Sequence, residues 1–200
     1  MPTPPLQYGE TYHIYNRGNN RENIFIEEKN YRYFLKFYAK YVEQVADTFA
    51  YCLMQNHFHF LVRIREEQDI QDCQSSKDWQ SYLSPSQAFS NLFSTYTKAI
   101  NKAYQRTGSL FQKPFQRLLV TSDEHLFQFV TYIHRNPVKH GFIQDFREWP
   151  YSSYSTICST NPTRLQRDQV LDWFDGRKGF EQAHLQGVNT NLISYLIQDD

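Results

Sequence analysis

Hydrophobic positions recur every second residue in several stretches of this chain, which is the period of a half-buried β-strand. In the first of these stretches, Tyr12 and Ile14 fall on one face and His13 on the other. Two later stretches are separated only by Gln55-Asn56, which predicts an antiparallel hairpin with a tight turn. The strands predicted in this way cover residues 10–16, 48–54, 57–64 and 115–121.

Three other stretches carry apolar residues at helical spacing instead. The second of these helices is expected to begin at Ser84-Pro85, because proline is favoured in a first turn. The third begins after Ser122, a good N-cap residue. Asn136-Pro137 should end or kink the third helix, since the residue before a proline is pushed out of the helical region. The predicted helices cover residues 27–45, 85–104 and 123–136.

The elements follow one another in the order β-α-β-β-α-β-α, which is the ferredoxin-like pattern of α+β proteins. We therefore expect an antiparallel sheet with helices on one face. Residues 66–84 are polar and should form a surface excursion. A chain of 200 residues suits one domain, so we assign residues 1–150 to it. Residues 151–200 are expected to form a partly helical C-terminal extension.

The charge balance excludes a protein that coats nucleic acid through a global basic excess, because Lys and Arg equal Asp and Glu at 21 each. Any anion site must therefore be local. One stretch carries five cations and no acid, although such a run is as often a solvated helix face. Aromatic side chains that could stack on bases are abundant, with 16 Phe, 15 Tyr and 3 Trp. The five cations are Lys98, Lys102, Arg106, Lys113 and Arg117.

The three cysteines, Cys52, Cys73 and Cys158, are odd in number and widely spaced, which argues against a disulfide framework and indicates a reducing compartment. No apolar run approaches the roughly 18 residues that span a bilayer. The first residues lack the basic and apolar regions of a signal peptide. We expect a cytoplasmic protein with no membrane partner.

The third predicted strand contains the most informative pair of residues, His57 and His59. Side chains alternate across a strand, so the two imidazoles share one face while Phe58 points to the other. Histidine is a common metal ligand and a poor core residue, which favours a metal or a charged substrate. Two half-exposed surface histidines would give the same pattern, and for such a pair without further context this is the commoner case.

The third predicted helix offers a complementary pair, Tyr132 and Asn136, which are four residues apart and share one helix face. An amide oxygen could complete a three-ligand site with two imidazoles and would favour a hard ion such as Mg²⁺ or Mn²⁺. Tyrosine can act as a covalent nucleophile. Judged from the residues alone, Tyr132 in so aromatic a chain is more typical of a core position than of a nucleophile.

Together these motifs resemble a known family. His57-Phe58-His59 resembles the HUH motif, in which two histidines flank a bulky hydrophobic residue. The segment from Tyr132 to Gly141 is similar to the tyrosine-bearing motif of the single-tyrosine HUH transposases, and most similar to that of the REP-associated tyrosine transposases. The resemblance covers about residues 8–155 and includes Tyr15-Asn16-Arg17-Gly18, Gly108-Ser109-Leu110-Phe111-Gln112 and Trp149-Pro150-Tyr151-Ser152-Ser153.

This resemblance implies a metal-dependent endonuclease and strand transferase that acts on single-stranded, hairpin-bearing DNA. Tyr132 would attack a phosphodiester and form a 5′-phosphotyrosine, while His57, His59 and Asn136 would hold Mg²⁺ or Mn²⁺. A monomer and a homodimer are both compatible with it. Two alternatives stay open: a domesticated nucleic-acid-binding regulator without catalysis, and a metal-dependent hydrolase that uses water. The candidate DNA-contacting residues are Arg17, Lys98, Lys102, Arg106, Lys113 and Arg117.

Overall fold

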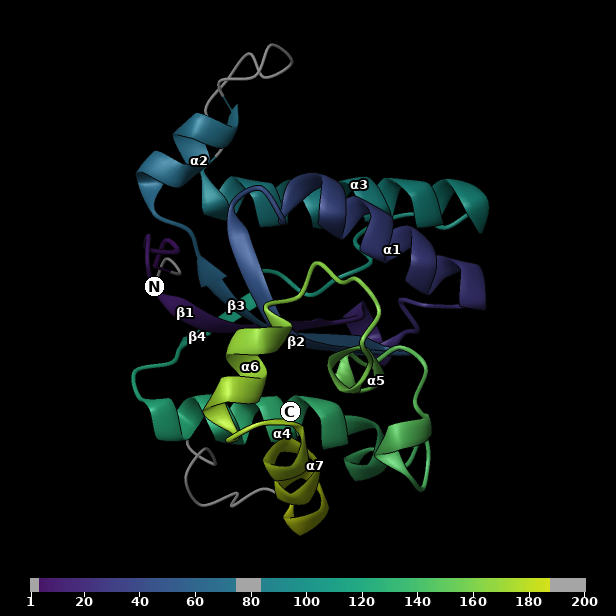
Figure 1. Cartoon of the computed structure of the whole chain (residues 1–200). Coiled ribbons are helices and arrows are strands. Elements are labelled where there is room, and N and C mark those ends of the chain that lie inside the picture. The colour runs from purple at the N-terminus through teal and green to yellow at the C-terminus, as the bar shows by residue number, and fades with distance from the viewer. Residues whose placement is uncertain (1–3, 75–83, 188–200) are drawn as a thin grey trace.

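A four-stranded antiparallel sheet lies at the centre of the fold (Figure 1). The computed structural model describes residues 4–74 and 84–187. The strands are β1 (Thr11–Arg17), β2 (Ala46–Met54), β3 (His57–Ile64) and β4 (Gln116–Leu119). They lie side by side in the order β2-β3-β1-β4, so the first and third strands are central, as in a ferredoxin-like sheet. The predicted α+β class is confirmed.

The predicted hairpin is confirmed, because β2 and β3 pair antiparallel and are joined by a turn at Gln55-Asn56. β1 lies on the other side of β3, with Tyr15 opposite His59 and Arg17 opposite His57. This register brings the end of the first strand next to the two histidines of the third.

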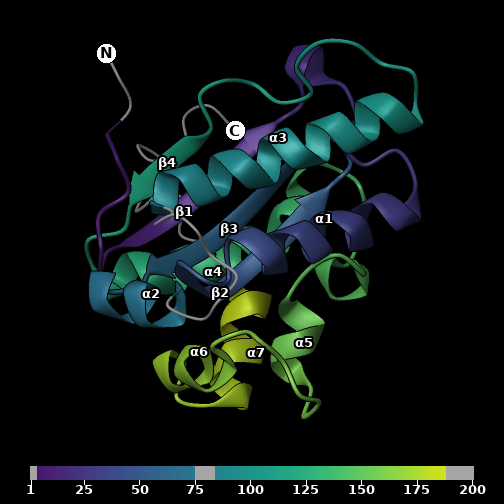
Figure 2. The ribbon, with the colours of Figure 1, turned by 90° about the horizontal axis from the view of Figure 1, so that it is seen from above.

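Two helices cover one face of the sheet, α1 (Glu28–Tyr41) and α3 (Pro85–Ala103), and they lie side by side (Figures 1 and 2). The predicted start of α3 is confirmed, since the Ser84 hydroxyl accepts a hydrogen bond from the backbone N–H of Gln87. Phe58 points into this layer, where its ring lies 5.3 Å from that of Phe34 and 5.5 Å from that of Phe93, measured between centroids.

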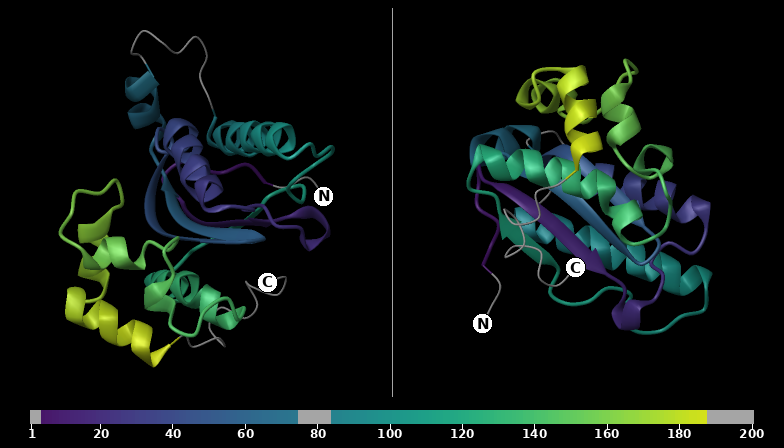
Figure 3. Two further views of the ribbon diagram at one scale, coloured as in Figure 1. Left: turned by 90° about the vertical axis from the view of Figure 1, so that its right-hand side faces the viewer. Right: turned by 90° about the horizontal axis from the view of Figure 1, so that it is seen from below.

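The expectation that the helices share one face is wrong for α4 (Asp123–Lys139), which covers the opposite side of the sheet (Figures 1 and 3). The physical reason is that the second face of β2 and β3 is also apolar. Ala50, Cys52 and Leu61 are buried there and form a second core with Phe129 of α4. We call this side of the sheet the α4 face.

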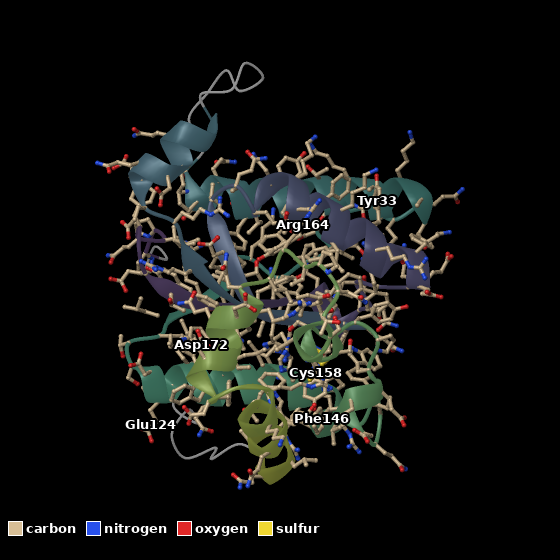
Figure 4. All side chains as sticks on the ribbon, in the orientation of Figure 1. Tyr33, Glu124, Phe146, Cys158, Arg164 and Asp172 are labelled. Carbon is tan, nitrogen blue, oxygen red and sulfur yellow. The ribbon has the colours of Figure 1, made fainter. Side chains whose placement is uncertain are left out.

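The residues after position 150 add to this second core. Tyr154, Phe174 and Phe180 are buried in it together with Phe129. Figure 4 shows Phe146 and Cys158 in this lower layer and Tyr33 on α1 in the upper one. The division of the chain at residue 150 stays a prediction. The elements here are η2 (Phe146–Glu148), α5 (Tyr154–Cys158), α6 (Arg167–Trp173) and α7 (Arg177–Gln186).

Two short elements lie between the longer ones. The segment that follows β1 contains η1 (Asn19–Arg21). The expected surface excursion begins with a helix, α2 (Glu67–Gln74), whose Ile70 is buried in the first core; residues 75–83 of that excursion lie outside the described residues. Cys52 and Cys158 are free thiols. Within the described ranges, no helix has both the length and the hydropathy that crossing a bilayer demands.

Candidate active site on the α4 face of the sheet

Strand β3 directs His57 and His59 to the α4 face, where both are buried, with 4% and 0% of their surface exposed. The flanking residues Phe58 and Phe60 point to the first core. The predicted alternation is therefore confirmed, and the two rings lie 5.3 Å apart between centroids. Their burial removes the reading of two half-exposed surface histidines.

The surroundings of His59 favour its neutral imidazole form. Burial lowers its pKa well below the ordinary value, and the nearby positive groups His140, Lys139 and Arg17 lower the pKa further. Its Nδ1 lies 2.9 Å from Nε2 of His13 on β1. Neutral imidazole is the form that binds metals, so the environment of His59 favours a ligand.

His57 is held at its Nδ1, which lies 2.6 Å from the side-chain oxygen of Asn56. On the other side its ring lies 4.6 Å from that of His140, measured between centroids. Because Nδ1 contacts an oxygen that only accepts, the ring nitrogen that His57 could present to a metal is Nε2.

Helix α4 supplies the facing residues. The Ser122 hydroxyl accepts a hydrogen bond from the His125 backbone N–H, which confirms the predicted N-cap. Asn136-Pro137 was predicted to end or kink the helix, and it does not end it, since the helix passes through Pro137 and ends at Lys139. A Schellman motif stops it there, in which the N–H groups of Gly141 and Phe142 donate to the carbonyls of Val138 and Pro137.

Tyr132 is buried, with 3% of its surface exposed, and its ring stands edge-on to His59 at a centroid distance of 5.8 Å. The ammonium of Lys139 lies 3.3 Å from its hydroxyl oxygen and 5.0 Å from its ring centre. A cation in this position would stabilise negative charge on the phenol oxygen, which is what a tyrosine nucleophile needs.

Asn136 lies one helical turn from Tyr132 and one turn from His140, on the same face of α4. Since Tyr132 contacts His59 and His140 contacts His57, the Asn136 side chain lies on the stretch of α4 that faces both strand histidines. It is 0% exposed, and neither its amide oxygen nor its amide nitrogen has a hydrogen-bond partner among the described residues. A buried amide in that state lacks the partners that stabilise such groups in proteins.

These donors fit the hard divalent ion that the motifs imply. Two imidazole nitrogens and one amide oxygen are acceptable ligands for Mg²⁺ or Mn²⁺, and three protein ligands leave positions for substrate oxygens. Among residues 4–74 and 84–187, no cluster of three or more His, Cys, Asp or Glu side chains is placed to hold a metal. The third ligand would therefore be the amide oxygen of Asn136, whose lack of hydrogen-bond partners is the observation that supports the fit.

The predicted DNA-contacting cations divide into groups. Lys98, Lys113 and Arg117 line a groove of about 900 Å³ between α3 and the segment that leads into β4, and we call it the α3 groove. No acidic side chain occurs among the described residues that line it. The Arg117 guanidinium lies 4.0 Å from the centre of the Phe115 ring. Polar side chains along the groove include Asn16, Asn91, Ser94, Asn101 and Gln112.

The other three candidates lie elsewhere. Lys102 is exposed near the end of α3 and does not line the α3 groove. Arg106 forms an ion pair with Glu22, which partly neutralises its charge. Arg17 is close enough to His59 to lower its pKa, so Arg17 belongs to the α4 face rather than to the groove.

Four residues near the site were not assigned to it from the sequence: His13, Asn56, Lys139 and His140. For two of them the sequence contains a feature that could have indicated the site. Asn56 directly precedes His57, and Lys139 lies two turns after Tyr132 on one helix face. His13 contacts His59 only through the pairing of β1 with β3, which no local pattern encodes.

Comparisons with known proteins bear on the family. No family model matches the chain. A protein of Haemophilus influenzae that bears the name of a REP-associated tyrosine transposase is 30% identical over 110 residues, or 54% of this chain. The match spans 58% of that relative, so the chain covers less than two thirds of its length. A solved structure of a REP-associated tyrosine transposase bound to a REP hairpin has a TM-score of 0.58 at 18% identity, over 81% of this chain and 89% of that one. The resemblance that the motifs predict is thereby confirmed, and the fold is shared.

Proposed function

We propose that this chain, a relative of the REP-associated tyrosine transposases, cleaves and rejoins single-stranded DNA through a covalent link to Tyr132. The substrate would be a strand that carries a hairpin, as the DNA in the related solved structure does. The single observation that carries the proposal is Asn136, whose buried amide has no hydrogen-bond partner among the described residues and which lies between Tyr132 and His140 on α4.

The residues suggest the following chemistry. The Tyr132 oxygen attacks a backbone phosphorus, a phosphotyrosine forms on the 5′ side, and the broken strand leaves with a free 3′-hydroxyl. The Lys139 ammonium, 3.3 Å from that oxygen, would stabilise the phenolate during attack. A divalent ion held by His57, His59 and Asn136 would neutralise charge on the scissile phosphate. Because the bond energy is kept in the phosphotyrosine, a second 3′-hydroxyl can reverse the step without ATP.

The α3 groove supports a role for an unpaired strand. Its cations can neutralise phosphates, its amide side chains can contact base edges, and its size suits a few nucleotides. Asn16 lines the groove, whereas the next residue, Arg17, points to the α4 face, near enough to His59 to lower its pKa. A strand that leaves the groove around this end of β1 would therefore reach the α4 face at the histidines.

The test is to trap the covalent adduct. Purified protein, Mg²⁺ or Mn²⁺ and a hairpin-bearing single strand should give a protein–DNA band that survives denaturing electrophoresis. Tyr132→Phe should abolish this band. Tyr31→Phe is the matched control, because Tyr31 is equally buried, at 5% exposed, but lies in the first core. An adduct that persists in Tyr132→Phe would show that another residue is the nucleophile.

The histidines have their own test. His57→Ala and His59→Ala should abolish the adduct while leaving the affinity for the DNA strand largely intact, because the α3 groove lies outside the α4 face. A fully active His57→Ala protein would overturn the proposed site.

A second candidate function is DNA binding without chemistry. The observation that favours it is that the α3 groove and Tyr132 lie on opposite sides of the sheet. The groove could therefore bind DNA while the histidine site is not used. The two functions differ in the adduct assay. A protein that binds the strand tightly but forms no adduct with either ion would be the non-catalytic binder, and release of cut DNA without an adduct would indicate a hydrolase that uses water.

A further inference from the structure

Both histidines of the proposed metal site are contacted at Nδ1, which leaves Nε2 as the nitrogen that could bind a metal. His59 is contacted at Nδ1 by His13 of β1, and His57 is contacted at Nδ1 by Asn56 of the hairpin turn. We propose that His13 and Asn56 are positioning residues that hold His59 and His57 in the tautomer whose Nε2 can bind a metal. The inference rests on the metal site of the proposed function.

The Asn56 side-chain oxygen fixes the position of the hydrogen on His57. An amide oxygen accepts hydrogen bonds and donates none, so the 2.6 Å contact requires the hydrogen of neutral His57 to be on Nδ1. The lone pair of His57 is then on Nε2. Asn56 itself is anchored by its backbone, because its carbonyl accepts a hydrogen bond of 2.8 Å from the N–H of Gly18 at the end of β1.

The contact between His13 and His59 links the positions of the hydrogens on the two rings. Between two neutral imidazoles 2.9 Å apart, one nitrogen donates and the other accepts. If His13 Nε2 donates, the hydrogen of His59 must be on Nε2, and that nitrogen cannot bind a metal. If His59 Nδ1 donates, its Nε2 carries a lone pair. Metal binding at His59 therefore requires His13 to be the acceptor.

The His13 ring is buried and fixed in position behind His59. It is 0% exposed, so it does not reach the substrate. Its ring is fixed between neighbours, with Tyr15 at 5.0 Å and Phe129 at 4.7 Å between centroids. A rigid acceptor behind a ligating histidine orients the ring and increases its basicity, and loss of such a partner typically weakens metal binding about 10- to 100-fold.

The experiment measures Mn²⁺ affinity of the full chain without DNA, by calorimetry or electron paramagnetic resonance. His13→Phe and Asn56→Leu keep the shape of each side chain but remove the acceptor, and they should bind Mn²⁺ about 10- to 100-fold more weakly than the unchanged protein. His13→Gln and Asn56→Asp restore an accepting oxygen and should bind within a few-fold of it.

His184→Gln is the matched control, because His184 belongs to a second buried histidine pair. Its Nε2 lies 2.8 Å from Nδ1 of His134, on the side of α4 that contacts α7. This variant should leave the Mn²⁺ affinity unchanged even where it lowers stability. A reduced affinity in His184→Gln equal to that in His13→Phe would show that both act through stability alone.

Nitrogen NMR on the unchanged protein with Mg²⁺ gives a readout that does not depend on variants. Both His57 and His59 should carry their hydrogen on Nδ1. Hydrogen on Nε2 of His59, or an unaltered Mn²⁺ affinity in folded His13→Phe, would overturn the inference. Binding that behaves as expected without any DNA adduct would overturn the proposed function only. Adduct formation with unaltered affinity in the variants would overturn the positioning role only.

Discussion

Lys139 lies two helical turns beyond Tyr132, and its ammonium is 3.3 Å from the tyrosine hydroxyl oxygen. The same ammonium lies 5.0 Å from the centre of the Tyr132 ring, so the lysine contacts both the ring and the oxygen. This relationship requires α4 to continue through Pro137, because a helix that ended at Asn136 would not carry Lys139 back over Tyr132.

The first prediction concerns this lysine. Lys139→Met keeps most of the aliphatic stem but removes the charge, and should slow adduct formation roughly 100-fold, which is typical for loss of one group that stabilises developing negative charge. Lys139→Arg should recover part of the rate. Single-turnover kinetics with saturating DNA would measure it. Equal rates for the unchanged and Lys139→Met proteins would exclude this role.

The second prediction separates stability from function at Asn136. A buried amide without partners destabilises the metal-free protein, so Asn136→Leu should raise the free energy of unfolding by about 1 kcal/mol while abolishing the adduct. Urea denaturation without metal is the measurement.

Asn30 provides the contrast for this experiment. Its side-chain oxygen accepts hydrogen bonds of 2.9 Å from the backbone N–H groups of Ile26 and Glu27, and its amide nitrogen donates to the Tyr104 hydroxyl at 3.1 Å. Asn30→Leu should therefore lower the free energy of unfolding by about 1–3 kcal/mol. A loss of stability in Asn136→Leu as large as in Asn30→Leu would indicate that the Asn136 amide is satisfied within the metal-free protein.

The third prediction is a pH dependence of stability. Burial lowers the pKa of His184 from 6.5 to about 4 in the folded protein. The unfolded chain therefore binds more protons than the folded protein between these values. The contribution of His184 to the free energy of unfolding is fully present above pH 6.5 and should be lost as the pH falls towards 4. The loss from this residue at pH 5 is about 2 kcal/mol. Urea denaturation near neutral pH and near pH 5 would show it, and His184→Gln should have the flatter profile. An identical pH profile in both proteins would assign the effect to other groups.

The fourth prediction compares cations inside and outside the α3 groove. Lys98→Ala and Lys113→Ala should weaken binding of single-stranded DNA and should each reduce the slope of log affinity against log salt by about 0.7, the value for one phosphate contact on a single strand. Lys102→Ala, on the same helix as Lys98 but outside the lining, should change neither quantity. Fluorescence anisotropy at several salt concentrations measures both. Equal effects of all three changes would indicate diffuse attraction instead of a groove.

Local pattern predicted most of the secondary structure. The hairpin around Gln55-Asn56, the helix start at Ser84 and the N-cap at Ser122 depend on residues that are neighbours in the chain, and each is confirmed. The end of α4 is harder to predict, because Pro137 disfavours the helix locally while Gly141, with its positive φ, stops the helix only after Lys139. The prediction of the side of the sheet that α4 covers is also wrong. That side depends on which faces of β2 and β3 still expose apolar surface after α1 and α3 have packed.

The candidate site shows the same division. Strand and helix periodicity are local, so the order of residues is enough to place His57 and His59 on one strand face and Tyr132 and Asn136 on one helix face. The meeting of these two faces, the contact of His13 with His59, and the groove lined by Lys98, Lys113 and Arg117 appear only in the folded chain. Those relations join residues far apart in the chain, and they arise from strand pairing and core packing, which act on the whole fold at once.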